Sequence, residues 1–195
     1  QRLADTHVIP AGQVFTDWRE MADAPKMADA VLICTQDAMH VEPAIAFAEA
    51  GYHILLEKPM APDADGCRQI VEAIEKAGVT FAVAHVSRYT TYSQQLKKML
   101  TDGLIGDIVS MQRLEPVGYW HQAHSFVRGN WRNEEESSFM LLAKSCHDID
   151  WIRYMMGASC EAVSSFGSLR HFRPEEAPDG ATARCLDCPV EADCP

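Results

Sequence analysis

The sequence lacks several features that would assign it to a class of protein at once. It has no run of about 18 consecutive apolar residues, so we expect no transmembrane helix and no membrane partner. Positive charge is scarce, with 17 Lys and Arg against 28 Asp and Glu and a formal net charge of -11. Because an acidic surface repels phosphate groups, nucleic acid is not expected as a partner either. Internal repeats are also absent.

The cysteines and the two chain ends indicate the cellular setting and whether the chain is a fragment. Cys34, Cys67, Cys146 and Cys160 occur singly in apolar or helical stretches, which does not resemble a disulfide framework and indicates a reducing, cytoplasmic setting. The first residue is not Met, no secretory leader is visible, and the last residues stop inside a cysteine motif. We therefore interpret the chain as a fragment truncated at both ends. Its 47% hydrophobic and 23% charged residues are ordinary for a globular protein with a core.

The first half of the chain alternates strand and helix. Short apolar runs bounded by turn residues predict strands, the first of them buried on both faces, and amphipathic stretches that end at glycine predict helices. The predicted strands are 30–35, 52–57 and 79–84, and the predicted helices are 41–50 and 63–77. This order at this spacing favours parallel pairing with right-handed crossovers. We predict an α/β fold, here the C-terminal half of a Rossmann-type doubly wound parallel sheet.

The pattern changes after about residue 88. The remaining predicted elements are a helix at 94–100, a strand at 105–113, a helix at 138–156, a strand at 162–169 and a loop at 173–181, while 116–133 has little periodicity. The chain thus divides into residues 1–88, a partial dinucleotide-binding domain, and residues 89–195, part of a second α/β domain.

Polar residues follow all three predicted strands. Thr35 and His40 come after the first strand, Glu57-Lys58-Pro59 after the second, and Arg88 after the third. Ligands bind at the carboxyl ends of the strands in open α/β sheets, so these residues are candidates for a binding crevice. Lys58 would face a cofactor or polarise a substrate hydroxyl there; a solvated charge pair at a strand end is the alternative.

A second cluster lies on the predicted helix 138–156. Lys144, His147, Asp148 and Trp151 share one stripe by their spacing. A histidine with a lysine one turn earlier and a carboxylate beside it suits an acid–base centre. The alternative is a Lys144–Asp148 surface pair next to a core-facing histidine.

The third cluster is Cys185, Cys188 and Cys194. Two thiolates two residues apart, with a third nearby, suit a tetrahedral zinc site whose fourth ligand would be His171, Cys160 or a residue further along. Free thiols or a redox pair are the alternatives.

Four motifs, in order, resemble one family. They are the run from Ala30 to Thr35 with His40, Gly51-Tyr-His-Ile-Leu-Leu-Glu-Lys-Pro59, Leu104-Ile-Gly-Asp-Ile108, and His147-Asp-Ile-Asp150 with the following Trp151. Together they are similar to the glucose–fructose oxidoreductase/inositol dehydrogenase (Gfo/Idh/MocA) family over almost the whole chain. The resemblance implies a Rossmann domain and a second domain with a large, mostly antiparallel sheet. It also implies hydride transfer between NAD or NADP and a sugar, sugar acid or cyclitol hydroxyl, in an enzyme that forms homo-oligomers.

The resemblance also implies roles for single residues. Lys58 would orient the substrate hydroxyl beside the nicotinamide, and His147 would be the acid–base residue or part of it. The residues that would line the cofactor crevice are Thr35, His40, Glu57 and Pro59. Arg88 matches the family's arginine after the last Rossmann strand, and Trp131 with Arg132 matches a pair that often precedes the catalytic helix.

The sequence departs from the family pattern at three places. None of the 11 glycines forms a G-x-G-x-x-G motif, so the pyrophosphate site and the residue that selects NAD over NADP are missing. Ala143 stands where many members carry an Asp, so either Lys144 and Asp148 adjust the proton chemistry of His147 or the active site has drifted. Gln36-Asp37 replaces the usual Pro-Asn. Three other functions therefore stay open: an NAD-dependent glycosidase, a non-catalytic dinucleotide-binding sensor, and a metal-stabilised binding module.

Overall fold

A parallel three-stranded sheet forms the centre of the first half of the protein. The computed structural model describes residues 6, 7 and 9–194. Strands β1 (Ala30–Ile33), β2 (His53–Leu56) and β3 (Phe81–Val83) lie side by side in that order, and both pairs are parallel. The predicted strands, their parallel pairing and the Rossmann-type α/β fold are confirmed.

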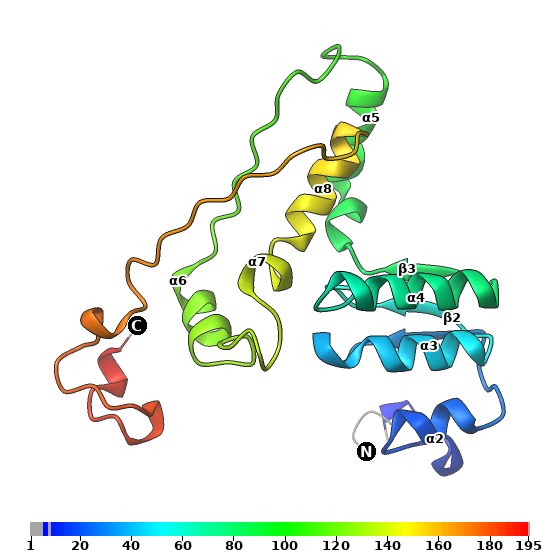
Figure 1. Ribbon diagram of the computed structural model, residues 1–195, viewed down its shortest axis with the longest axis horizontal. Helices are drawn as coiled ribbons and strands as arrows, with labels where there is room; N and C mark the ends of the chain where they lie inside the picture. Colours follow the sequence, from blue (N-terminus) through cyan, green and yellow to red (C-terminus); the bar gives the residue numbers. More distant parts are fainter. Residues whose placement is uncertain (1–5, 8, 195) are drawn as a thin grey trace.

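Helices cover one face of this sheet. Figure 1 shows α3 (Val41–Glu49) and α4 (Ala64–Ala77) side by side over the same face. Val31, Ile33, Ile54 and Leu56 point into this core and are buried, whereas Leu32 on the opposite face is 65% exposed. Our prediction that the first strand is buried on both faces is therefore wrong for the described chain. Right-handed crossovers in the same direction place both connecting helices on one face, which leaves the other face open.

Helix α4 begins and ends at the residues that its sequence predicts. The Asp63 side chain accepts a hydrogen bond from the Gly66 backbone N–H at 2.7 Å, and Gly78 ends the helix in the left-handed conformation, with φ of 67°. On the apolar side of this helix Ile70 is fully buried against the sheet, while the adjacent Val71 is 42% exposed. Near the chain start, η1 (Ala11–Gln13) precedes α2 (Trp18–Asp23), which packs on α3 through Trp18.

The second half is built from helices joined by extended segments. After η3 (Val86–Tyr89), helix α5 (Thr91–Thr101) lies beside α8 (Cys146–Met156), and α6 (Tyr119–His121) runs into a π-helical turn, η4 (Gln122–Val127). None of the helices in the described part has both the length and the apolar character that membrane crossing requires. The remaining short 3-10 turns are η2 (Asp37–Met39), η5 (Pro174–Glu176), η6 (Cys185–Asp187) and η7 (Glu191–Asp193).

The predicted helix 138–156 is wrong in its continuity. It consists of α7 (Met140–Ala143) and α8, with a break at Lys144 and Ser145. The break leaves the Ala143 carbonyl oxygen to accept a hydrogen bond from the Lys58 ammonium at 2.7 Å. A tertiary contact thus replaces a helical one.

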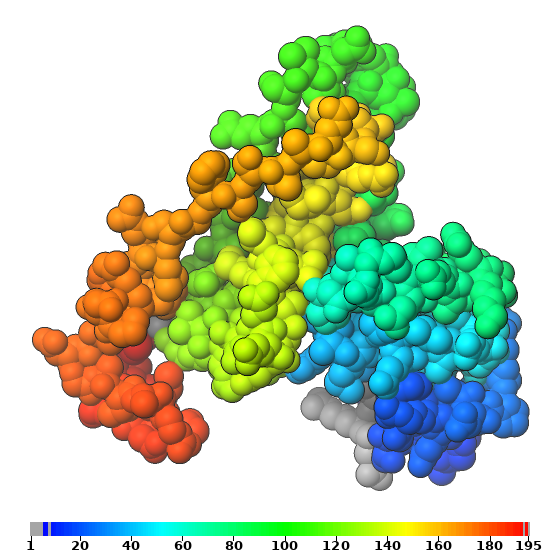
Figure 2. Space-filling model, in the orientation of Figure 1, coloured from blue at the N-terminus to red at the C-terminus, as the bar shows by residue number. Residues whose placement is uncertain are grey.

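The two later strands, 105–113 and 162–169, are also wrong for the described residues. No strand follows β3 in residues 84–194, so the antiparallel sheet of the second domain is not seen there. Val109 is 95% exposed and Phe166 is 97% exposed. An extended segment without a neighbouring strand makes no inter-strand hydrogen bonds, so neither segment forms a strand. Figure 2 shows the later segment leading to the outlying C-terminal part.

Candidate active site

The carboxyl ends of the strands face α7 and α8. Thr35 follows β1, Glu57 and Lys58 follow β2, and His85 follows β3. Because parallel strands all end at the same edge, residues far apart in sequence meet there. The three strand ends that the sequence marked as candidates therefore lie on one side of the molecule.

Lys58 reaches from this edge to the break between α7 and α8. Its ammonium donates to the Ala143 carbonyl, and no carboxylate of the described chain lies within ion-pair distance of it. The following peptide bond, Lys58–Pro59, is cis. Lys58 thus brings a positive charge that is balanced by a carbonyl dipole and not by an anion.

His147, on the first turn of α8, meets a second histidine. Its ring centroid is 5.9 Å from that of His85, with an interplanar angle of 80°. The Nδ1 atoms of both rings are buried and have no hydrogen-bond partner among the described residues. Burial, followed by the nearby charges of Lys58, His85 and Lys144, lowers the pKa of His147 below its ordinary value. A neutral imidazole is the form that accepts a proton.

His85 stands between His147 and an ion pair. Its Nε2 is 4.0 Å from Asp150 Oδ1, and Arg88 binds both oxygens of that carboxylate, with Nε to Oδ2 at 2.6 Å. The hydrogen bonds to Asp150 raise the pKa of Arg88, and burial lowers the pKa of His85. Arg88, which follows β3, therefore fixes Asp150 and so connects the end of the sheet to α8.

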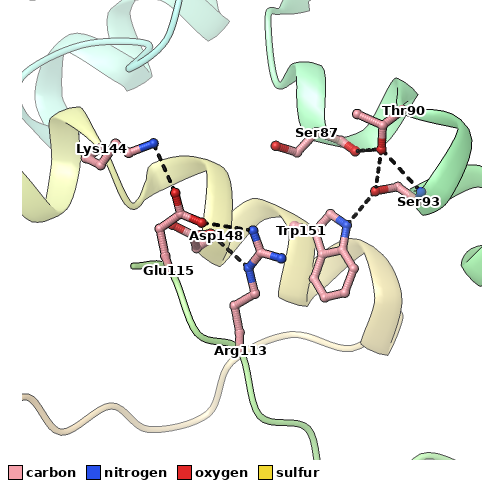
Figure 3. A network of polar contacts seen from close by, with 8 residues as sticks. All are labelled: Ser87, Thr90, Ser93, Arg113, Glu115, Lys144, Asp148 and Trp151. Carbon is pink, nitrogen blue, oxygen red and sulfur yellow. Dashed lines mark hydrogen bonds and ion pairs between the residues drawn. The ribbon is translucent and has the colours of Figure 1, made fainter. Parts of the chain in front are cut away.

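Lys144 and Asp148 do not form the pair that we considered as an alternative. Figure 3 shows each of them bound to the segment before α6: Lys144 to Glu115 at 3.1 Å, and Asp148 to Arg113 at 3.0 Å. Arg113 also contacts Glu115 at 3.3 Å. These contacts compensate the charges of Lys144 and Asp148 on both sides of His147.

The same network continues to α5. Arg113 stacks over the Trp151 ring at 4.9 Å, and the Trp151 indole N–H donates to Ser93 Oγ at 2.8 Å (Figure 3). Thr90 in turn donates to Ser93 Oγ at 2.9 Å. Trp151, which the stripe on α8 included, thus has a packing role against α5.

His40 holds two strand-end loops together. It is fully buried, and its ring nitrogens lie 2.8 Å from the Pro59 carbonyl oxygen and 3.0 Å from the Thr35 carbonyl oxygen. The Thr35 hydroxyl donates to the Met39 carbonyl. In the described chain His40 therefore shapes the crevice from behind rather than facing it.

Asp37, which replaces the usual Asn, joins the two halves. It is buried and accepts hydrogen bonds from the Trp131 indole N–H at 3.0 Å and from the Ser138 hydroxyl. Trp131, a candidate substrate residue, is thus tied to the end of β1. Arg132 pairs with Glu136 on the surface.

An apolar cavity of about 460 Å³ adjoins the histidine pair. It lies between Pro59–Ala61 after β2, Cys67 of α4, and the α7–α8 region. His85 and Asp150 supply its polar lining, and Cys146 also reaches it. Burial raises the pKa of the Cys146 thiol, so this thiol is a weak nucleophile.

The structure does not gather the C-terminal cysteines into a metal site. All seven cysteines are free thiols. In the described range no group of three or more His, Cys, Asp or Glu side chains is placed to hold a metal ion. Backbone hydrogen bonds from the 182–190 turn lower the pKa of the Cys188 thiol.

Sequence reasoning gave no site role to His85, Asp150, Arg113 and Glu115, although Asp150 is part of the His147-Asp-Ile-Asp150 motif. The first two had a usable signal, since His85 follows a strand as Lys58 does, and Asp150 is three residues after His147 on the same helix. Arg113 and Glu115 had none, because they belong to a segment with no regular structure.

Two family profiles match this chain in succession. Residues 1–85 match the oxidoreductase family with an NAD-binding Rossmann fold, and residues 93–185 match the GFO/IDH/MocA C-terminal domain. A parallel sheet with chemistry at its carboxyl edge is the architecture of a dinucleotide-binding α/β protein. The chain belongs to the GFO/IDH/MocA oxidoreductase family.

Named relatives agree with this assignment. The chain is 30% identical over 150 residues to 2,7-anhydro-N-acetylneuraminate hydratase of Escherichia coli, covering 76% of this chain and 39% of that protein. It is 31% identical over 142 residues to levoglucosan dehydrogenase of Pseudarthrobacter phenanthrenivorans, covering 73% of this chain and 36% of that protein. The chain thus spans less than half the length of these relatives.

Solved structures show the same fold. Levoglucosan dehydrogenase in complex with NADH and levoglucosan superposes with a TM-score of 0.62 at 31% identity, covering 73% of this chain and 38% of that chain. Myo-inositol 2-dehydrogenase from Lactobacillus plantarum gives a TM-score of 0.62 at 25% identity, covering 73% of this chain and 41% of that chain.

Proposed function

We propose that the protein transfers a hydride between a nicotinamide cofactor and a hydroxyl of a sugar, sugar acid or cyclitol. One observation carries the proposal: Lys58 and His147 lie at the carboxyl edge of the parallel sheet, and His147 has a buried, unpartnered Nδ1. The levoglucosan and inositol dehydrogenase relatives support this class of substrate.

The residues at this edge fit the nicotinamide end of NAD or NADP. The cofactor, when bound, supplies the hydride acceptor or donor. The chain itself supplies a fixed cation, Lys58, and a proton acceptor, His147, on one side of the crevice. Hydride removal from a carbon requires that the proton of its hydroxyl leave at the same time, so a base beside the hydroxyl lowers the barrier.

The two residues take different roles. His147 is neutral near neutral pH because its pKa is lowered, so it accepts the hydroxyl proton during oxidation and returns it during reduction. The Lys58 ammonium keeps one hydrogen bond to Ala143 and has further N–H groups to orient the hydroxyl and stabilise negative charge on its oxygen.

Removal of the Lys58 ammonium tests this function. In the complete protein, Lys58→Ala is expected to reduce kcat by at least about a hundredfold, measured by nicotinamide absorbance across sugars, sugar acids and inositols with NAD and with NADP. The control is Lys76→Ala, which removes an exposed lysine at the end of α4. Near-normal turnover of Lys58→Ala contradicts the role of Lys58.

A second candidate is a reaction without net nicotinamide reduction, such as glycoside cleavage through a transient oxidation. Two relatives are named as 2,7-anhydro-N-acetylneuraminate hydratases, which supports testing this kind of reaction. Release of an aglycone or another product at constant nicotinamide absorbance would support it. Binding of dinucleotide with no turnover at all would favour the sensor.

The remaining proposals concern assembly and metal. We propose a homo-oligomeric cytoplasmic enzyme, which light scattering and cell fractionation test. Zinc at Cys185, Cys188 and Cys194 stays a prediction, and stoichiometric zinc in the freshly purified complete protein would support it.

A further inference from the structure

Helix α6 exposes two aromatic side chains that the proposed function does not use. Tyr119 is 65% exposed and Trp120 is 67% exposed. The indole of Trp120 stacks on the ring of His121, with centroids 5.4 Å apart and an interplanar angle of 23°. His121 therefore covers one face of the indole, and the large exposure of Trp120 leaves the opposite face open to solvent.

The backbone before α6 leaves room for this indole. A Cβ atom at Gly118 would lie 2.9 Å from Trp120 Nε1, which is closer than such atoms approach in proteins. Gly118 has a φ of -59°, which every residue adopts, so its backbone conformation does not require glycine. The absence of a side chain at Gly118 thus allows the Trp120 ring to keep its position.

A row of rings connects Trp120 to the edge of the sheet. His121 contacts Phe126 with 6.0 Å between centroids, and Phe126 contacts Trp131 with 6.3 Å. The Trp131 indole N–H donates to Asp37, which follows β1. Between these rings the chain makes the π-helical turn η4, a rare element that is frequent at functional sites. Packed rings thus join the exposed indole to the edge where the proposed active site lies.

Two polar side chains follow Trp120 directly in the chain. The Gln122 amide and the ring nitrogens of His121 make no hydrogen bond with any residue that the structure describes. An amide group offers both donors and an acceptor, and a neutral imidazole offers one donor and one acceptor. An open aromatic face beside such groups suits a ligand whose ring is apolar on its faces and hydroxylated at its edge.

We propose that Trp120 of α6 is a stacking subsite for the ring of a pyranose or cyclitol, with Tyr119 beside it. This inference rests on the proposed function for its link to the reaction. A pyranose or cyclitol with mostly equatorial hydroxyls carries C–H bonds on both faces of its ring. One such face covers the open indole, while hydroxyls at the ring edge bind His121 and Gln122. Trp120 thereby selects cyclic substrates over open-chain polyols.

The size of the exposed patch favours one ligand ring over a protein partner. On α6 and η4 the large hydrophobic side chains that are exposed are Tyr119, Trp120 and Val127. A stable protein interface takes about 20–30 residues from each partner. Three side chains on two short elements are too few for such an interface, whereas one indole face is sufficient for one sugar ring.

Three variants of the complete protein test the subsite. Trp120→Ala removes the ring, and Trp120→Phe keeps a smaller one. Gly118→Ala keeps the indole but places a methyl group against it. The matched control is Tyr92→Ala, because Tyr92 is also 67% exposed but lies on α5. Far-ultraviolet circular dichroism and light scattering compare the fold and the oligomeric state of all four variants.

The first readout is binding and needs no turnover. Calorimetry measures the Kd of methyl β-D-glucopyranoside, scyllo-inositol and open-chain sorbitol with NADH or NADPH present, so that no hydroxyl is oxidised. We expect both cyclic ligands to bind more tightly than sorbitol. Their Kd is expected to rise about three- to tenfold in Trp120→Ala and in Gly118→Ala, to rise less in Trp120→Phe, and to stay unchanged in Tyr92→Ala.

Three outcomes of this experiment overturn the subsite. The first is an equal Kd in the unaltered protein and in Trp120→Ala. The second is the failure of both cyclic ligands to bind the unaltered protein more tightly than sorbitol does. The third is the loss of an oligomer in a folded Trp120→Ala, which assigns the patch to a protein interface.

The second readout is turnover of a cyclic substrate, followed by nicotinamide absorbance. We expect KM to rise about three- to tenfold in Trp120→Ala with little change in kcat, because stacking far from the reacting carbon stabilises substrate and transition state alike. Turnover with an unchanged KM overturns the subsite and leaves the proposed function in place. If Kd rises as expected but no cyclic ligand reduces nicotinamide, the subsite stands and the proposed function fails.

Discussion

At the scale of single residues, the site is defined by what surrounds His147. Ala143, which has no polar side chain, contributes its carbonyl, which binds Lys58. Burial, and after it the charges of Lys58, His85 and Lys144, lowers the pKa of His147, and Asp148, the one charge given as raising it, is bound to Arg113. His147 is therefore held neutral, which suits a base.

The first prediction concerns pH. Because the pKa of His147 is lowered, the acid limb of kcat/KM is expected below the ordinary histidine value of 6.5. In Ala143→Asp, a carboxylate one turn before His147 raises that pKa and moves the acid limb to higher pH. A pH–rate profile of both proteins measures this. Ala162→Asp, in an exposed segment, is the control, and an equal shift in both variants would contradict the local effect.

At the scale of elements, helix α4 and the segment before α6 are stabilised in different ways. Helix α4 has its N-terminal cap at Asp63, its C-terminal glycine at Gly78, and a stripe whose centre is buried against the sheet. The segment before α6 has no regular structure, but Arg113 fastens it to Asp148 and Trp151 of α8, and Glu115 fastens it to Lys144. Helix α4 is therefore stabilised by its own sequence pattern, and the segment before α6 by side-chain contacts with distant residues.

The second prediction concerns this stripe. Ile70→Ala is expected to lower the free energy of unfolding by about 2–5 kcal/mol, because it leaves a cavity in the core. Val71→Ala, at the adjacent and 42% exposed position, is expected to cost clearly less. Urea unfolding of the two variants compares them. Equal losses in the free energy of unfolding would contradict the packing of α4 through Ile70.

The third prediction concerns Arg113. Its removal leaves the buried Asp148 carboxylate without its cation, so Arg113→Ala is expected to lower the free energy of unfolding by about 1–3 kcal/mol. The matched control, Arg132→Ala, breaks an exposed pair with Glu136 and is expected to cost at most about 1 kcal/mol. Thermal unfolding ranks the two, and the reverse order would contradict the network in Figure 3.

At the scale of the whole molecule, side-chain contacts join the halves at the sheet edge, among them the hydrogen bond from Lys58 to the Ala143 carbonyl. Asp37 binds Trp131 and Ser138, and Arg88 binds Asp150. Between them lie His85 and His147, half-buried where the halves meet. Unfolding therefore exposes both histidines to water at once, which makes stability depend on pH.

The fourth prediction concerns this dependence. The folded-state pKa values of His85 and His147 are lowered, so the unfolded chain binds more protons as pH falls below the ordinary histidine range. Their contribution to stability is present above the unfolded pKa and is lost as pH falls toward the folded pKa. Urea unfolding at about pH 7.5 and about pH 5.5 is expected to show this loss, and His85→Phe to show a smaller one. An unchanged loss in His85→Phe would exclude a contribution from His85.

Local patterns predicted the first half well. The strands, the two helices over them and the ends of α4 follow from apolar runs, helical spacing and capping residues that act within a few residues of one another. The strand-end rule then placed Lys58 correctly at the edge. It also applies to His85, which lies closer to the end of β3 than Arg88, the residue that the sequence prediction named.

The second half was predicted less well for a physical reason. At the break between α7 and α8, the Ala143 carbonyl binds Lys58, which lies 85 residues away in the chain. The extended segments at 105–113 and 162–169 have the composition of strands, but a strand forms only when a partner supplies its hydrogen bonds. Neither cause is visible in the local sequence.

The sequence by itself determined the order of the strands and helices over residues 30–83 and the parallel sheet, because these depend on local spacing and on a rule of topology. It also predicts Lys58 and His147 as site residues. Only the tertiary structure decided that His85 meets His147, that Lys58 binds the Ala143 carbonyl, and that Lys144 and Asp148 bind Glu115 and Arg113. Such contacts join residues across a folded edge, where distance along the chain carries no information about distance in space.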